Sequence, residues 1–136
     1  MRPLLERWDE VQPRLVEAKR LLLLADFDGT LAPLVRDPEK ASIPASRLRL
    51  LEALRRRPAV ALGIISGRAL TDLKKRIPLD GIYYAGNHGL EIEGPDLEFR
   101  HPEAEAARSD LERIAEELEL RLWDIPGIFL EDKGFG

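Results

Sequence analysis

Two aspartates, one residue apart, follow a short and unbroken apolar run. The run covers residues 21–25, and Asp26 and Asp28 come directly after it. It is too short to cross a membrane and too continuous for a half-solvated strand, so it predicts a central strand covered on both faces. Side chains two apart in an extended chain share a face, so the two carboxylates can converge on one small volume. Two acids there repel each other unless a cation or a shared proton relieves them, which makes this pair the first candidate for chemistry.

The same residues have two other interpretations. Asp28-Gly29 between apolar segments is a strong signal for a hairpin turn, and this alternative stays open on these residues alone. An EF-hand calcium loop also contains Asp-x-Asp, but its glycine and its bidentate glutamate would fall on Leu31 and Asp37. A leucine run also precedes the pair where an EF-hand has a helix. The sequence therefore excludes a calcium loop of this kind.

Composition limits the class of protein. The chain has 136 residues, of which 44% are hydrophobic, enough for one packed domain. Its formal net charge of -4 argues against a nucleic-acid groove, and the absence of cysteine excludes disulfides and thiolate metal sites. Glu6, Asp9 and Glu10 stand where a signal peptide needs an apolar core, and no segment approaches transmembrane length. We expect a cytoplasmic protein with no nucleic-acid or membrane partner.

Strand-like and helix-like segments alternate along the chain. Helical spacing near the N-terminus is interrupted by Pro13, which predicts two short helical pieces. Further helices are expected over residues 44–57 and from 68 or 69 to 77, and further strands over 59–65 and 82–85. This order predicts an α/β fold with a parallel sheet, right-handed crossovers and helices on both faces.

Polar residues follow the second and third predicted strands. Active sites in parallel sheets lie at the carboxyl ends of the strands, and these ends carry Ser66-Gly67-Arg68 and Asn87-His88. The segment after the second strand has the features of an anion site: a hydroxyl, a glycine that permits close approach, and the free amides at the start of a helix. A phosphoryl group is the natural occupant of such a site. The guanidinium of Arg68 can add a bidentate grip on phosphate or on a substrate hydroxyl.

Each of these residues also has a purely structural interpretation. Ser66 alone is more often a helix N-cap than a catalytic donor. Asn87 and its glycine neighbours can serve backbone positions with positive φ, and a lone His88 is more often a surface residue than a catalytic one. Ser66 does not stand in the pattern of a nucleophile elbow, and two histidines without cysteine argue against a zinc site of these residue types.

Several segments, in order, resemble a known family. Residues 22–31 (LLLADFDGTL) and 64–68 (IISGR) are similar to the first two motifs of the haloacid dehalogenase-like phosphatases. More narrowly, the segments DGTLAP, SGR, YAGNHG and LEDKG resemble those of trehalose-6-phosphate phosphatases. The resemblance runs from about residue 21 to the last residue.

The resemblance implies two domains. Residues 1–100 would form a partial Rossmann-like haloacid dehalogenase core, and residues 101–136 the first part of an α+β cap domain. The pattern after residue 94 supports a cap, because residues 97–100 are typical of a strand and a helix that starts at Pro102 has one apolar and one acidic face. The acids on that helix are expected to be solvated. Its apolar stripe consists of Ala107, Leu111, Ile114, Ala115, Leu118 and Leu122.

The resemblance also implies a role for each site residue. Asp26 would be the nucleophile that attacks phosphorus to give an aspartyl-phosphate. Asp28 would protonate the leaving sugar oxygen and then take a proton from the attacking water. Mg²⁺ would bridge the Asp26 carboxylate and the phosphoryl group, with the main-chain carbonyl of Asp28 as a further ligand. The phosphate-binding residues would be Thr30, Ser66 and Gly67, and the substrate-binding residues Arg68, Asn87, His88, Glu131 and Lys133.

The reaction that the resemblance implies is hydrolysis of trehalose 6-phosphate to trehalose and phosphate. Two further features of the family are not found in the sequence: the lysine of the third motif and the acidic pair of the fourth. The resemblance therefore implies an incomplete phosphatase that has little activity alone. In the family's sheet order, one edge of its first strand would be open. The alternatives are a phosphatase for another sugar phosphate, a non-catalytic sugar-phosphate-binding fragment, and a half that needs an identical or a different partner to cover the open edge.

Overall fold

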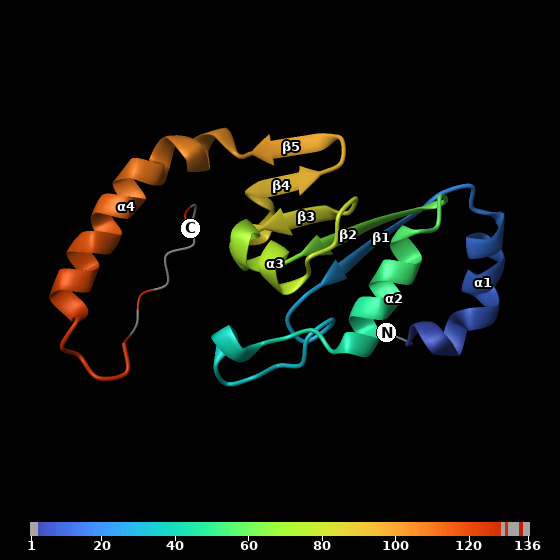
Figure 1. Ribbon diagram of the computed structural model, residues 1–136, viewed down its shortest axis with the longest axis horizontal. Coiled ribbons are helices and arrows are strands. Elements are labelled where there is room, and N and C mark those ends of the chain that lie inside the picture. The colour runs from blue at the N-terminus through green and yellow to red at the C-terminus, as the bar shows by residue number, and fades with distance from the viewer. Residues whose placement is uncertain (1–2, 129, 131–133, 135–136) are drawn as a thin grey trace.

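A single mixed α/β sheet organises the chain. The computed structural model describes residues 3–128, Leu130 and Gly134. Its five strands lie in the order β1-β2-β3-β4-β5, so that neighbours in sequence are also neighbours in the sheet (Figure 1). The expected α/β class is confirmed. The strands are β1 (Leu21–Asp26), β2 (Val60–Ile65), β3 (Tyr83–Gly86), β4 (Glu91–Gly94) and β5 (Leu97–Arg100).

The first three strands are parallel, as the order of the sequence elements predicts. In their register, Asp26 is opposite Ile65, and Ile65 is in turn opposite Ala85. The carboxyl ends of all three strands therefore finish at the same level of the sheet. The segments that follow them meet at one edge, which is the place where parallel sheets hold their sites.

A hairpin completes the sheet on one side. The predicted strand over residues 97–100 is found as β5, which pairs antiparallel with β4. The sequence analysis did not identify β4, although Glu91-Ile92-Glu93 has the polar-apolar alternation of a strand. β4 also pairs antiparallel with β3, so the sheet is parallel only over β1 to β3.

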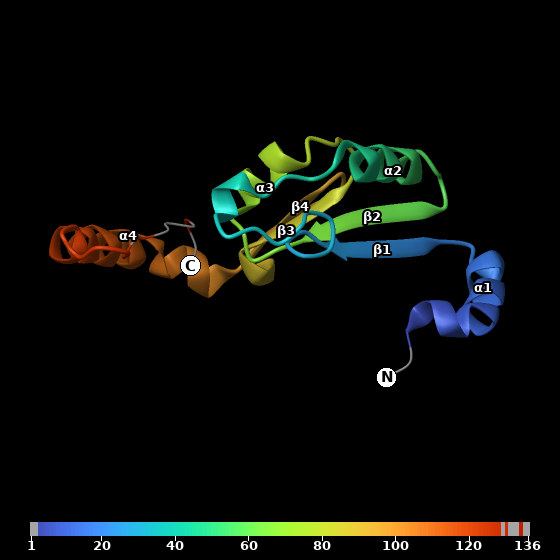
Figure 2. The ribbon, with the colours of Figure 1, turned by 90° about the horizontal axis from the view of Figure 1, so that it is seen from below.

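The helices divide into those that cover the sheet and those that extend from it. α2 and α3 lie together on one face of the sheet (Figure 2). Phe27, Leu62, Ile64, Leu73 and Ile77 are fully buried and form the centre of the core. The helical elements are η1 (Leu4–Arg7), α1 (Trp8–Glu17), η2 (Pro38–Lys40), α2 (Ala45–Arg55), α3 (Leu70–Arg76), η3 (Asn87–Gly89) and α4 (Pro102–Leu122).

The prediction of helices on both faces is wrong for the part of the chain that the structure describes. β1 is not covered on both faces either, since exposure alternates along it and Leu22 and Leu24 are 61% and 51% exposed. An apolar hollow of about 540 Å³ lies over this open face, lined by residues that include Ile65 and Tyr83. The reason is topological. When successive strands advance in one direction across a sheet, crossovers of the same hand put both helices on the same face.

Pro13 does not divide the N-terminal helical segment. It lies inside α1, and the 3-10 helix η1 changes into α1 between Arg7 and Trp8 instead. A proline removes its own N–H donor and crowds the carbonyl four residues before it, which here affects a single turn of a helix that has no buried residue.

α4 confirms the predicted helix after β5. It begins at Pro102 in the first turn, where the missing N–H of proline has no cost. The helix has no buried residue, and its apolar stripe is open to solvent: Leu111, Ile114 and Leu118 are 39%, 43% and 39% exposed. α4 runs away from the sheet (Figures 1 and 2). Among the described helices, none has the length and apolar content needed to span a membrane.

The Tyr84 hydroxyl is hydrogen-bonded to the backbone segment that follows α3. Its hydroxyl lies 2.6 Å from the carbonyl oxygen of Ile77 and 2.7 Å from that of Leu79, and it accepts a hydrogen bond from the Leu79 amide. Tyr84→Phe leaves these backbone groups without that partner, so we expect the free energy of unfolding to fall by about 1 to 2 kcal/mol. Urea unfolding followed by circular dichroism measures this change.

Tyr83→Phe is the matched control. The Tyr83 hydroxyl donates to the Asp96 carboxylate on the exposed surface, so its loss should change stability by less than about 0.5 kcal/mol. Equal losses in the two variants would contradict the structural role that we assign to Tyr84.

Candidate active site

The ends of the three parallel strands are joined by backbone hydrogen bonds. The Phe27 amide donates to the carbonyl of Ile65 (3.3 Å), and the Ser66 amide donates to the carbonyl of Ala85 (2.9 Å). These bonds continue the ladder one residue beyond β1 and β2. Asp26, Ser66 and Asn87 therefore follow one another along the same edge of the sheet, as the sequence predicts.

The chain turns sharply after Asp26. Phe27 is fully buried, whereas Asp26 is exposed and Asp28 half-buried. The turn is closed by hydrogen bonds from the Leu31 and Ala32 amides to the Phe27 carbonyl, of 3.0 and 2.8 Å. Because β1 pairs parallel with β2, this turn does not connect the two strands of a hairpin, and the hairpin alternative is wrong.

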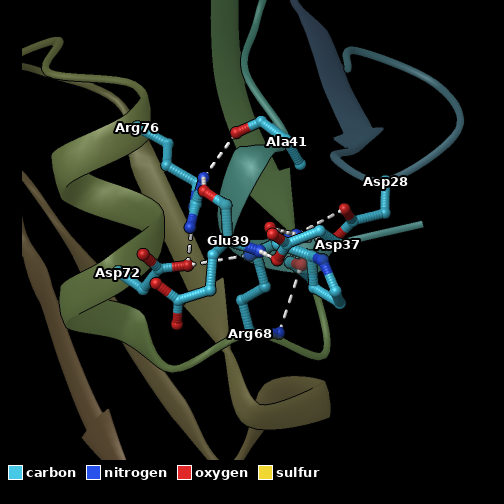
Figure 3. A network of polar contacts seen from close by, with 9 residues as sticks. Asp28, Asp37, Glu39, Ala41, Arg68, Asp72 and Arg76 are labelled. Atoms are coloured by element: carbon cyan, nitrogen blue, oxygen red, sulfur yellow. Dashed lines mark hydrogen bonds and ion pairs between the residues drawn. The ribbon is translucent and has the colours of Figure 1, made fainter. Parts of the chain in front are cut away.

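Arg68 holds the side chain of Asp28. Its Nε donates to one carboxylate oxygen and its Nη2 to the other, each over 2.8 Å (Figure 3). The Arg68 side chain is 11% exposed, and its Cζ lies 5.3 Å from the centre of the Phe27 ring. The hydrogen bond with Asp28 raises the pKa of Arg68 above its ordinary value. Arg68 was expected to bind phosphate or a substrate hydroxyl through two hydrogen bonds. In this structure it makes the two hydrogen bonds to Asp28 instead.

Two residues of α3 extend this ion pair. Arg68 Nη1 lies 3.1 Å from Asp72 Oδ2, and Arg76 Nε lies 2.7 Å from the same oxygen. Burial opposes the charged form of Asp72, but the hydrogen bonds from Arg76 and Arg68 outweigh it and lower the pKa of Asp72. Arg76 also donates to the main-chain oxygens of Ala41 and Glu39. The sequence analysis missed this network, although an Arg-Asp-Arg pattern at i, i+4 and i+8 signals it.

Ser66 and Gly67 form a tight loop before α3. Ser66 is 4% exposed, and its Oγ accepts a hydrogen bond from the Arg68 amide (3.2 Å). A Cβ on Gly67 would lie 2.6 Å from the His88 ring, so a larger residue at this position would have to displace that ring. The Ser66 and Arg68 amides both have partners within the protein, and α3 begins only at Leu70. The loop therefore offers an anion fewer free amides than the sequence suggests.

Asn87 and His88 occupy a strained turn after β3. Both have positive φ, of 48° and 57°, which is uncommon for residues other than glycine. Asn87 is 2% exposed; its amide donates to the Arg68 carbonyl (2.8 Å) and its side chain to Glu91 (2.7 Å). Asn87 thus has the backbone role that the structural interpretation proposed. Strain of this kind tends to collect at functional sites.

The remaining predicted site residues lie at the margin or outside the described structure. Thr30 is exposed, and its main-chain oxygen accepts a hydrogen bond from Arg47, a residue that the sequence analysis did not identify. Arg47 also donates to the Leu31 carbonyl and so fixes the loop after Asp28. Glu131 and Lys133 fall outside the described residues.

Acidic side chains are too few here to complete a metal site. Within residues 3–128, Leu130 and Gly134, no group of three or more histidine, aspartate or glutamate side chains could hold a metal ion. The Asp26 carboxylate and the Asp28 carbonyl are hard oxygen donors of the type that Mg²⁺ prefers. These residues therefore fit magnesium as part of a ligand set, and both oxygens of the Asp28 carboxylate are already engaged by Arg68.

Comparison with known proteins identifies the group to which the chain is related. The family model described as Trehalose-phosphatase matches residues 24–136. The trehalose-phosphate phosphatase of Mycobacterium ulcerans (strain Agy99) is 45% identical over 112 residues, which are 82% of this chain and 28% of that protein. The trehalose-phosphate phosphatase of Mycobacterium bovis (strain BCG / Pasteur 1173P2) is 39% identical over 120 residues, 88% of this chain and 30% of that protein. The chain thus spans less than a third of the length of these relatives.

Solved structures agree with this relationship. The C-terminal domain of C. albicans trehalose-6-phosphate phosphatase is similar with a TM-score of 0.73 and 27% identity, over 91% of this chain and 43% of that one. A trehalose-6-phosphate phosphatase related protein has the same TM-score and 26% identity, over 83% of this chain and 48% of that one. Because the family model covers most of the sequence, the chain belongs to the trehalose-phosphatase family.

Proposed function

We propose that the chain carries the nucleophile side of a phosphatase site that hydrolyses trehalose 6-phosphate to trehalose and phosphate. The observation that carries this proposal is the pair Asp26 and Asp28 at the end of β1, with the second carboxylate held by Arg68 and the first left open to solvent. The names of the relatives support trehalose 6-phosphate as the substrate. A phosphatase for another sugar phosphate is the alternative within the same chemistry.

In this proposal Asp26 is the nucleophile. A carboxylate oxygen of Asp26 forms a bond to phosphorus, and the bond from phosphorus to the sugar oxygen breaks. The exposed position of Asp26 at the strand end leaves room for an in-line approach of the phosphate. Water then attacks phosphorus, the bond to Asp26 breaks, and inorganic phosphate leaves.

Asp28 is the proton carrier in both steps. It gives a proton to the leaving sugar oxygen and later takes one from the attacking water, so the carboxyl group returns to its starting state. A carboxylate has about four lone-pair positions, so the two hydrogen bonds from Arg68 leave one position on each oxygen for this proton. The grip of Arg68 thus fixes the direction in which Asp28 presents its free lone pairs.

Binding of the substrate is divided between the strand ends and the C-terminal segment. Thr30, Ser66 and Gly67 are proposed to hold the phosphoryl oxygens. Arg68, Asn87 and His88 are proposed to line the sugar side from the strand ends. A cap over residues 101–136, whose helix α4 extends from the sheet and has its apolar stripe open, is proposed to supply Glu131 and Lys133.

Magnesium is part of the proposal as a partner of these residues. The Asp26 carboxylate and the Asp28 main-chain carbonyl would hold it, and its charge would offset the negative charge of the phosphoryl group. Segments that resemble the lysine and the acidic pair of the family's later motifs are not found in this sequence. We therefore expect slow turnover from these 136 residues alone.

Asp26→Asn tests the proposed nucleophile. The purified chain is incubated with trehalose 6-phosphate and magnesium, and released phosphate is measured by colorimetry. We expect Asp26→Asn to abolish any release, because an amide is a poor nucleophile toward phosphorus. Beryllofluoride mimics a phosphoryl group on a carboxylate, so its effect on the melting temperature gives a second measurement that does not need turnover. We expect this stabilisation also to be lost in Asp26→Asn.

Asp110→Asn is the control, since Asp110 lies on the exposed face of α4 and pairs only loosely with Arg113 (3.5 Å). It should behave as the unsubstituted chain does. Phosphate release or beryllofluoride stabilisation that survives in Asp26→Asn would exclude Asp26 as the nucleophile. Stabilisation by trehalose 6-phosphate without any release would favour the non-catalytic binding fragment.

β1 presents two surfaces that favour self-association. It is the edge strand of the described sheet, and such edges pair with other chains. Its open face also exposes Leu22 and Leu24. We expect the chain to form dimers as its concentration rises in sedimentation velocity, and Leu24→Lys to weaken them by placing a charge on this face. Leu120→Lys, on α4, is the control because Leu120 is 78% exposed and lies away from the sheet. A chain that stays monomeric at every concentration would contradict this prediction.

A further inference from the structure

Asp28 depends on other residues for its orientation. It lies beyond the end of β1, in the turn before Gly29, whose φ of 85° belongs to the left-handed region. Its backbone forms an isolated bridge with Ala32, which does not fix the side chain. The Asp28 carboxylate accepts two hydrogen bonds from Arg68, each over 2.8 Å.

Arg68 is itself held by α3. Its guanidinium is a planar fork, so a third contact on Nη1 limits rotation about the axis that points at Asp28. Asp72 Oδ2 provides this contact at 3.1 Å. Nη2 also donates to the carbonyl of Pro38 (2.8 Å), which ties the same guanidinium to the loop before α2.

Arg76 fixes Asp72 in turn. It lies one helical turn further along α3, donates to Asp72 Oδ2 over 2.7 Å, and reaches the carbonyls of Ala41 and Glu39. The chain of contacts thus runs from Asp28 through Arg68 and Asp72 to Arg76 and ends on backbone groups (Figure 3). A network that ends on backbone atoms holds its members better than an isolated surface pair.

We propose that Asp72 is a positioning residue for Asp28, which it orients through Arg68. This inference rests on the proposed function, because it explains how the proton carrier of that reaction is held. In the described part of the chain, the Asp72 carboxylate accepts hydrogen bonds from Arg68 and Arg76 and from neither Asp26 nor Asp28, so we assign it no direct part in bond making or breaking. The mechanism thus depends on a residue 44 positions away from the carboxylate that it serves.

A structural role and a positioning role for Asp72 make different predictions. The Asp72 side chain is 36% exposed, whereas those of its partners Arg68 and Arg76 are 11% and 16% exposed. Removing the Asp72 charge leaves these two guanidiniums without this partner, so we expect some loss in the free energy of unfolding. A positioning role predicts in addition a change in the geometry around Asp28 in the folded chain, which a measurement of stability does not report.

The experiment compares Asp72→Asn and Asp72→Glu in the isotope-labelled chain at a fixed neutral pH. NMR measures the Nε–Hε signal of Arg68 and the side-chain carboxyl ¹³C signal of Asp28, with Asp28→Asn used to assign both. We expect Asp72→Asn to shift both signals and to speed exchange of the Arg68 Hε with water. Asp72→Glu keeps the carboxylate and should shift them less. Asp110→Asn, an aspartate with an arginine three residues later on α4, should leave both signals unchanged.

Unchanged Arg68 and Asp28 signals in a folded Asp72→Asn chain would overturn the inference, and so would equal shifts in Asp72→Glu and Asp72→Asn. Thermal unfolding of each variant shows that it is folded. A wrong proposed function would give a different result. The NMR shifts in Asp72→Asn would then still be seen, but Asp26→Asn would respond to beryllofluoride and trehalose 6-phosphate in the same way as the unsubstituted chain.

Discussion

The parallel register of β1, β2 and β3 is the constraint on which the site depends. It sets Asp26 level with Ile65 and Ile65 level with Ala85, so the segments that follow these residues have to meet. A slip of one residue would turn every side chain of the displaced strand to the other face and would break the backbone bonds that continue beyond the strands. The polar residues of the site are thus brought together by pairing of apolar strands, not by attraction among themselves.

The same topology leaves one face of the sheet open. Advancing from β1 to β2 to β3 with crossovers of one hand places α2 and α3 on a single face, where Phe27, Leu73 and Ile77 make the core. The opposite face keeps exposed leucines on β1, and the apolar stripe of α4 is also open to solvent. The described part of the chain therefore presents apolar surface that ordinarily marks an interface.

The sequence predicted most of the helices and strands, but it did not predict contacts between residues that are far apart in the chain. The spacing of apolar residues and the positions of prolines predicted the parallel strands, β5 and the start of α4 at Pro102, because these features depend on neighbouring residues. The open face of β1 was not predicted, since an apolar run does not reveal which side its helices take. Arg68 was expected to bind a ligand. Its choice of Asp28, 40 residues earlier, follows from the fold and could not be read from spacing.

The two carboxylates end in different environments because Phe27 stands between them. Strand alternation alone would have placed Asp26 and Asp28 on one face, but the chain leaves the strand at Asp26 and buries the Phe27 ring, against which Arg68 packs. One carboxylate is thus exposed and the other is fixed by a guanidinium. Two acids of the same type can divide the roles of nucleophile and proton carrier only when their surroundings differ in this way. The buried aromatic residue within Asp-Phe-Asp therefore contributes to the difference between the two carboxylates as well as to the core.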